Sequence, residues 1–232
     1  MLVLQSFPPI LGLRSPSPFT VKAEALLAMS GLPYRIERVS DPRKAPRGKL
    51  PVLVDGERTI PDSAHIQTHL EREHGVDFDG WLSPQERARA TAYRRLVEDH
   101  LYFIAGNMRW NMHPDAVRDS YFKDIPALIR PLIFRGMLRG VNKGYREMGL
   151  GRHTEAEQSA FAREDIDAIA TELGDRPFFL GDRPASIDAS IYGALHQALD
   201  CELRTPVTNH AERHPNLRAY VDRATGRLFP EG

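Results

Sequence analysis

The chain has 232 residues, 41% of them hydrophobic, which is enough for one large domain or two modest domains with a buried core. Lysine plus arginine and aspartate plus glutamate number 31 each, and this balance excludes the strong net field that attracts nucleic acid or an anionic membrane. The single cysteine, Cys201, excludes an intramolecular disulfide and is typical of a reducing compartment.

The sequence shows no clear targeting or membrane segment. The opening apolar run, residues 1–4, is short, carries no positive leader and soon meets Pro8-Pro9. The most apolar later segment, 128–138, contains Pro131 and is interrupted by arginines, whereas a membrane span needs about 20 mostly apolar residues. We therefore expect a soluble, cytoplasmic protein without a membrane span.

The first 76 residues alternate short strands and helices. The apolar patterns and turn signals predict, in chain order, a strand at 1–4, a helix after Ser17-Pro18, a strand at 34–38, a hairpin turning at Asp55-Gly56 and a helix opening at 61–63. This is the layout of a thioredoxin-like domain, in which the proline that enters the third strand, here Pro51, is usually cis. We therefore expect residues 1–76 to form an α/β domain of this kind.

From residue 83 onward the hydrophobic period is helical, and 75–80 reads as a linker. Capping boxes begin helices at Ser83 and Thr154. Further helices are expected in three places: about 117–148 with a break near Pro126 or Pro131, about 186–200, and a short one after Pro215. The sequence thus predicts an all-helical second domain, 83–232, after the α/β domain.

Ser17-Pro18-Phe19 marks the start of the first helix. Serine followed by proline is a helix N-cap with proline at the first helical position, and most such caps are purely structural. The same geometry places a hydroxyl beside free main-chain amides at the positive end of a helix, where an anion is favoured. A thiolate is an anion that this position would suit.

The chain resembles the glutathione S-transferase superfamily over nearly its whole length. Residues 17–19, 49–53 and 62–63 look like the three glutathione-contacting blocks of the serine-type classes. The later motifs resemble the failed-axon-connections and metaxin-like branch, and they are residues 98–103, 109–110, 149–154, 181–189 and 215–220. The resemblance implies a thioredoxin-like domain followed by a helical-bundle domain, glutathione as co-substrate, and a homodimer.

The resemblance also implies which groups would bind the thiol and the γ-glutamyl end of glutathione. Ser17 would donate its hydroxyl to the thiolate, and Ser15 lies close enough in sequence to compete for that role. Asp62 would pair with the γ-glutamyl amino group, while Ser63 and the amides that open its helix would hold the carboxylate. Taken alone, Asp62-Ser63 is equally a helix cap.

The remaining contacts concern the rest of the tripeptide and the second substrate. Leu50, before Pro51, would offer main-chain groups to the cysteinyl unit, Lys49 would meet the glycyl carboxylate, and Phe19 would belong to the substrate-binding surface. Tyr102 and Trp110 would line a pocket for a small apolar electrophile. Aromatic residues at helical spacing are as readily explained as core.

Two departures from the family pattern limit the chemistry. Related redox members carry cysteine where Ser17 or Thr20 stands, so thiol–disulfide exchange is not expected here. Ala185 occupies a position where the family has a hydroxyl cap, which leaves two alternatives: Ser186 replaces the cap, or the cap is weaker.

No metal is expected. His210 and His214 have metal-ligand spacing, but no third ligand lies near them in the sequence. The prediction is therefore a serine-type glutathione transferase that adds the glutathione thiolate to an electrophile. The alternative is a non-catalytic, metaxin-like interaction protein that keeps only the fold.

Overall fold

A computed structural model describes residues 1–230, so the last two residues of the predicted 83–232 domain lie outside the described range. The first part of the chain contains one four-stranded sheet. Its strands are β1 (Leu2–Ser6), β2 (Tyr34–Arg38), β3 (Val52–Asp55) and β4 (Arg58–Pro61). They lie in the order β2-β1-β3-β4, with β2 parallel to β1 and the other neighbours antiparallel. The predicted strands and hairpin are confirmed.

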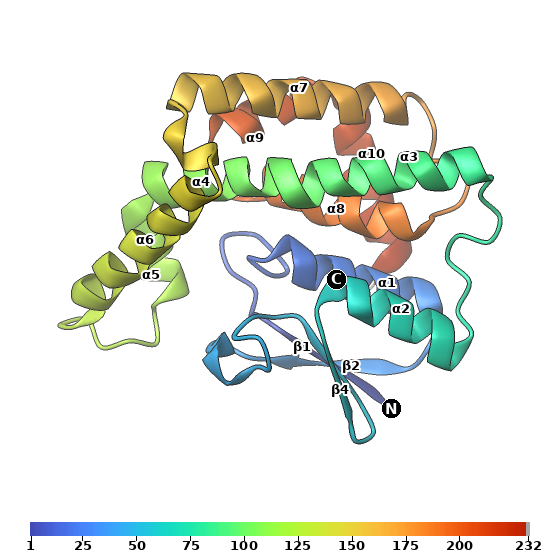
Figure 1. Cartoon of the computed structure of the whole chain (residues 1–232), viewed down its shortest axis with the longest axis horizontal. Coiled ribbons are helices and arrows are strands. Elements are labelled where there is room, and N and C mark those ends of the chain that lie inside the picture. The colour runs from blue at the N-terminus through green and yellow to red at the C-terminus, as the bar shows by residue number, and fades with distance from the viewer. Residues whose placement is uncertain (231–232) are drawn as a thin grey trace.

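Two helices, α1 (Pro18–Ser30) and α2 (Ser63–His74), lie between the sheet and the later helices (Figure 1). A short 3-10 helix, η1 (Pro42–Lys44), precedes β3. All residues of α1 from Thr20 to Leu27 are buried, since the helix is covered on every side. The sheet with its two covering helices confirms the thioredoxin-like layout.

Helices make up the regular structure of the rest of the described chain. They are α3 (Pro84–Arg95), the π-helical η2 (Leu96–Leu101), α4 (Tyr102–Met112), α5 (Pro114–Tyr121), α6 (Arg130–Glu147), the 3-10 helix η3 (Leu150–Arg152), α7 (Glu155–Leu173), α8 (Ser186–Leu199), α9 (Pro206–Ala211) and α10 (Pro215–Leu228). Figure 1 shows α5 and α6 together at one end of this helical layer. Between residues 1 and 230, no helix has both the length and the apolar character needed to cross a bilayer.

The helix starts follow the predicted signals closely. Ser83 and Thr154 each accept a hydrogen bond from the amide three residues later, and the glutamate at that third position returns one, as capping boxes require. The predicted break after 117 falls at 122–129, which contains Pro126, whereas Pro131 sits in the first turn of α6, where proline fits. The last helix, α10, is longer than the short one expected.

Close contact between α1 and α8 joins the two halves of the molecule. A Cβ on Gly193 of α8 would lie 2.7 Å from the carbonyl oxygen of Pro18, so only glycine permits this approach at the start of α1. Lys22 of α1 makes a 2.6 Å ion pair with Glu98 of η2, which also accepts the Ser190 hydroxyl at 2.8 Å. These contacts fix the start of α1 against the helical layer.

The start of α8 resolves the two alternatives left open for its cap. Ala185 provides no side-chain cap, and the Asp188 carboxylate accepts the amides of Ala185 and Phe179, each at 2.8 Å. The Ser186 hydroxyl does not replace the missing cap, because it donates to Asp79 of the linker at 2.5 Å. Asp79 also accepts the Ser186 amide at 2.8 Å, so a linker carboxylate satisfies the first amide of the helix.

Candidate functional site

Ser17 lies at the N-terminus of α1 with its hydroxyl uncommitted. It is the N-cap residue in extended conformation, Pro18 follows as the first helical residue, and its side chain makes no hydrogen bond to the helix. The residue is half-buried, and its hydroxyl makes no hydrogen bond with any group within residues 1–230. An anion placed here would meet a free O–H donor and the positive end of a long buried helix.

Ser15, the second candidate, is in a different environment. It is fully buried, and its oxygen accepts the Ser17 amide at 3.4 Å while hydrogen bonding to the Thr20 hydroxyl. Thr20 in turn donates to the Ser17 carbonyl at 2.8 Å, so Ser15 must be the donor toward Thr20. These bonds close a ring that uses both the donor and an acceptor site of Ser15. The structure therefore gives the two serines distinct surroundings that the sequence could not distinguish.

The other two segments that resemble glutathione-contacting blocks, residues 49–53 and 62–63, lie next to each other beside the sheet. The Leu50–Pro51 peptide is cis, as expected, and both residues are buried. The Pro51 carbonyl accepts the Asp62 amide at 3.1 Å, which joins the entry of β3 to the start of α2. Lys49 is exposed and forms no ion pair within the described part of the chain.

Asp62 has unusual backbone geometry. Its φ of 84° lies in the region that favours glycine, which costs about 1–3 kcal/mol for another residue and is typical of functional positions. Its exposed carboxylate accepts the Ala64 amide at 2.9 Å and lies 3.8 Å from the Arg47 guanidinium. Ser63, the first residue of α2, is buried, and its amide and hydroxyl have no hydrogen-bond partner between residues 1 and 230. The start of α2 thus combines a carboxylate with uncommitted donors.

The two aromatic residues predicted to line the electrophile pocket, Tyr102 and Trp110, lie in different aromatic clusters. The Phe19 and Tyr102 rings meet edge to face with centroids 4.8 Å apart, which brings the start of α1 against α4. Burial raises the pKa of Tyr102, so its hydroxyl stays protonated. Trp110 instead packs with Tyr121 of α5 and stacks on Phe134 of α6, with centroids 6.1 Å apart for the stacked pair. Of the two predicted pocket residues, Tyr102 therefore contacts Phe19, and Trp110 belongs to a separate cluster.

A cavity of about 290 Å³ opens in the helical layer beside α4 and α6. Most of the residues that line it are of polar type, including Asn107, Asn111, Asn142 and Tyr145. Neither predicted pocket residue, Tyr102 nor Trp110, lines it.

Arg109, to which the sequence assigned no role, and Gln197, which it did not single out, hold the loop before α1 in place. Arg109 is buried and donates to the Pro16 carbonyl at 3.5 Å and to both oxygens of Gln197, at 2.8 and 3.2 Å. Gln197 donates to the Ser15 carbonyl at 2.7 Å. Arg109 is thus paired with amide and carbonyl oxygens, and the two side chains hold in place the loop that carries Ser17.

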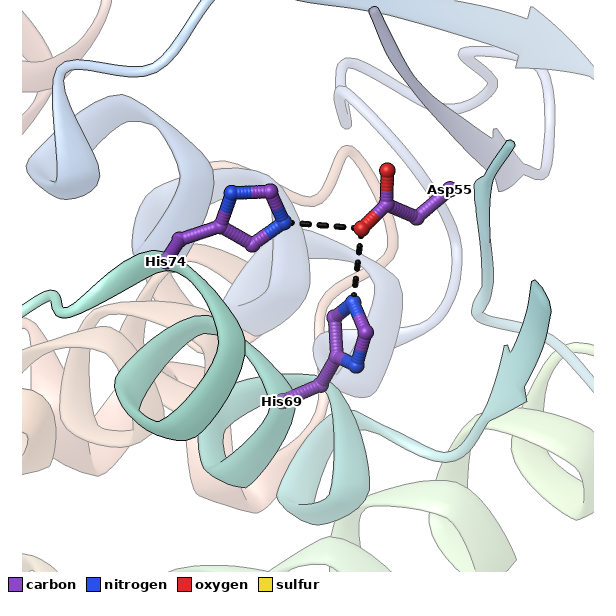
Figure 2. A group of neighbouring side chains, drawn as sticks. All are labelled: Asp55, His69 and His74. Atoms are coloured by element: carbon purple, nitrogen blue, oxygen red, sulfur yellow. Dashed lines mark hydrogen bonds and ion pairs between the residues drawn. The ribbon is translucent and has the colours of Figure 1, made fainter. Parts of the chain in front are cut away.

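Two side-chain clusters have metal-ligand character. Asp55, His69 and His74 place three donor atoms within 4.8 Å of one another, and Figure 2 shows both rings pointing at one Asp55 oxygen. Asp167 forms the same arrangement with His210 and His214, at 2.7 and 2.9 Å. The expectation that no metal binds at His210 and His214 rested partly on the lack of a third ligand near them in the sequence, and the fold brings one close in space, Asp167 of α7.

Comparisons with known proteins agree with this architecture. Residues 18–116 match the family described as "Glutathione S-transferase N-terminal domain", and residues 162–224 match "Glutathione S-transferase, C-terminal domain". The chain is 32% identical to the isoprene-epoxide–glutathione S-transferase of Rhodococcus sp. (strain AD45), over 96% of this chain and 97% of that protein.

Two relatives with lower sequence identity are not named as transferases. The chain is 27% identical to Failed axon connections of Drosophila melanogaster, where the alignment covers 94% of this chain and 56% of that longer protein. It is 28% identical to metaxin-1 of Macaca fascicularis, over 87% of this chain and 67% of that protein. Among solved structures, the β-etherase LigF from Sphingobium sp. strain SYK-6 has a similar fold, with a TM-score of 0.68 and 17% identity over 100% of this chain and 99% of that one.

Proposed function

Because this chain belongs to the glutathione S-transferase superfamily, in the branch that includes Failed axon connections and metaxin-1, we propose that it is a serine-type glutathione transferase. It would bind glutathione against the thioredoxin-like half and add the thiolate to an electrophile seated against the helical half. The observation that carries the proposal is the uncommitted hydroxyl of Ser17 at the start of α1.

Ser17 is of the right strength for stabilising a thiolate. A free thiol has a pKa near 8.5, and lowering it by about two units requires about 2.7 kcal/mol of preferential stabilisation of the anion. One hydrogen bond to a charged group contributes roughly 1.5–3 kcal/mol, and a helix N-terminus adds about 0.3–1 kcal/mol. Ser17 and α1 together can therefore supply the whole effect, with the hydroxyl acting as donor and keeping its proton.

The rest of the tripeptide has matching groups. The Asp62 carboxylate would pair with the γ-glutamyl amino group, and the free amide and hydroxyl of Ser63 would receive its carboxylate. Leu50 would bind the cysteinyl unit through its main chain, and the unpaired Lys49 would meet the glycyl carboxylate. The strained backbone of Asp62 supports this assignment, because strain of that kind is retained mainly where function requires it.

The electrophile would be small and apolar, and we favour an epoxide by analogy with the Rhodococcus relative. The glutathione sulfur would form a bond to one ring carbon, the bond from that carbon to oxygen would break, and the oxygen would take up a proton. The proton would come from solvent, and Tyr102, which contacts Phe19 beside Ser17 and stays protonated, would donate a hydrogen bond to that oxygen. A homodimer in the cytoplasm completes the proposal, in keeping with the superfamily resemblance and the buried free thiol of Cys201.

Metaxin-1 and Failed axon connections favour a second candidate, a protein that keeps the fold but binds a protein partner without catalysis. Calorimetric titration with glutathione distinguishes the two. The transferase proposal expects micromolar to low-millimolar binding that is lost in Asp62→Ala and retained in the control Asp115→Ala, whose carboxylate is 84% exposed. Absence of glutathione binding by the folded parent would reject the transferase and support the interaction protein.

A further inference from the structure

We propose that Asp55, His69 and His74 form a binding site for a divalent transition-metal cation, with Zn²⁺ as the best-matched ion. The proposal is independent of glutathione binding and of the transferase assignment. It rests on the convergence of three ligand atoms from two elements and on the electrostatics of the place where they meet.

The three side chains come from two rigid elements. Asp55 is the last residue of β3, next to the hairpin turn, while His69 and His74 lie in the last turns of α2. Figure 2 shows the imidazole rings approaching the same carboxylate oxygen from different directions. An ion held by all three would tie the β3–β4 hairpin to the C-terminal end of α2.

The distances suit a tetrahedral ion. His69 Nε2 lies 2.9 Å and His74 Nε2 lies 2.8 Å from Asp55 Oδ2. Zinc bonds to nitrogen and oxygen are about 2.0–2.2 Å long, which puts neighbouring ligands of a tetrahedral site about 3.3 Å apart. Each histidine nitrogen therefore needs to move only about 0.5 Å away from Asp55 Oδ2, and all three ligand atoms already lie within 4.8 Å of one another.

The ligand types and their exposure also fit. Two neutral imidazoles and a carboxylate are ligands that Zn²⁺ accepts, and three protein ligands leave a fourth position for water. The side chains of His69, His74 and Asp55 are 9%, 26% and 24% exposed, so the ligands are held by their surroundings while an ion can still enter. None of the three has a role in the proposed glutathione site.

The local field favours a cation. His74 is the last residue of α2, and Gly75 ends the helix in a left-handed conformation, so the carboxyl end of the helix dipole faces this region. The nearby cation Arg58 is already paired with Glu73 at 2.5 Å. The site thus combines a carboxylate with the negative end of a three-turn helix.

The second cluster has the same ligand types and similar distances, but its exposure and local field are less suitable. His214 directly precedes the first residue of α10, so it lies at the positive end of that helix. The side chain of Asp167 is 54% exposed, against 24% for Asp55, so this carboxylate is less restrained by its surroundings. Because its composition is the same, this cluster provides a matched control.

The test is a titration of the 232-residue chain, freed of metal by a chelator, with Zn²⁺ and with Co²⁺ as a spectroscopic probe. Removing even a supporting partner of a metal ligand typically costs 10–100-fold in affinity, so losing a ligand should cost at least about tenfold. We expect His74→Gln and Asp55→Asn to show this loss, and the matched control His214→Gln to bind like the parent. Zn²⁺ should also raise the unfolding temperature of the parent and not that of His74→Gln.

Both variants alter partly exposed side chains, and circular dichroism of the metal-free proteins checks that they fold. Parent-like Zn²⁺ affinity and stoichiometry in folded His74→Gln and Asp55→Asn would overturn the proposal. Loss of binding in His214→Gln instead would also overturn it, because the ion would then belong to the Asp167 cluster.

Discussion

Replacing Ser17 by alanine removes a hydroxyl that makes no hydrogen bond within residues 1–230 and that we assign to the bound thiolate. The fold should tolerate the change, because no described contact depends on this side chain. If the hydroxyl contributes roughly 1.5–3 kcal/mol to the anion, its loss should raise the pKa of bound glutathione by about 1–2 units. The α1 amides remain, so part of the depression of the thiol pKa should persist.

The assay follows the ultraviolet absorbance of the thiolate against pH with the protein saturated by glutathione. Ser15→Ala is the matched control. It breaks a buried ring of hydrogen bonds and should lower the free energy of unfolding by about 1–3 kcal/mol while leaving the thiol pKa near that of the parent. A parent-like thiol pKa in Ser17→Ala, with the rise in Ser15→Ala, would refute the assignment.

The remaining predictions concern stability. Asp188→Ala leaves the buried amides of Phe179 and Ala185 without their acceptor, while the Tyr220 hydroxyl keeps the main-chain carbonyl of residue 188 at 3.2 Å. The free energy of unfolding should therefore fall by at least about 2 kcal/mol in denaturant titrations, and the exposed control Asp182→Ala should change little. A loss below about 1 kcal/mol would contradict this. Lys22→Met leaves the Glu98 carboxylate without its cation and should lower the free energy of unfolding by about 3–5 kcal/mol. The double variant Lys22→Met with Glu98→Gln should recover part of that loss. Equal stability of these single and double variants would show that the pair is not coupled. Burial lowers the pKa of Lys22 below 10.5, so the folded protein binds fewer protons than the unfolded chain just below that pH. The free energy of unfolding should therefore gain a contribution that grows as pH rises toward 10.5, and an unchanged alkaline profile in Lys22→Met would refute it.

Features with local causes were predictable from the sequence. The Ser17-Pro18 cap, the turn at Asp55-Gly56 and the capping boxes at Ser83 and Thr154 each depend on residues within a few positions of one another. The strand and helix order followed from these signals, and the resemblance to glutathione S-transferases completed the architecture.

Features that depend on distant contacts were not predictable. Arg109 and Gln197 are 88 residues apart and hold the loop of Ser17 through main-chain oxygens, which no sequence motif indicates. The difference between Ser15 and Ser17 arises from burial, and that becomes visible only once the loop is folded against the helical layer.

The two metal-ligand clusters also depend on contacts between residues that are far apart in the sequence. The spacing of His210 and His214 is typical of metal ligands, but the carboxylate that contacts them belongs to Asp167, 43 residues before His210. Asp55 lies on a strand and its two histidines on the following helix, so neither periodicity nor spacing could bring the three together.

A crystal structure grown in saturating glutathione tests the central claim most directly. The account predicts the ligand sulfur within about 3.5 Å of Ser17 Oγ, with the γ-glutamyl end at Asp62 and Ser63. A sulfur bound elsewhere, or a start of α1 closed off by neighbouring side chains with no glutathione present, would contradict it.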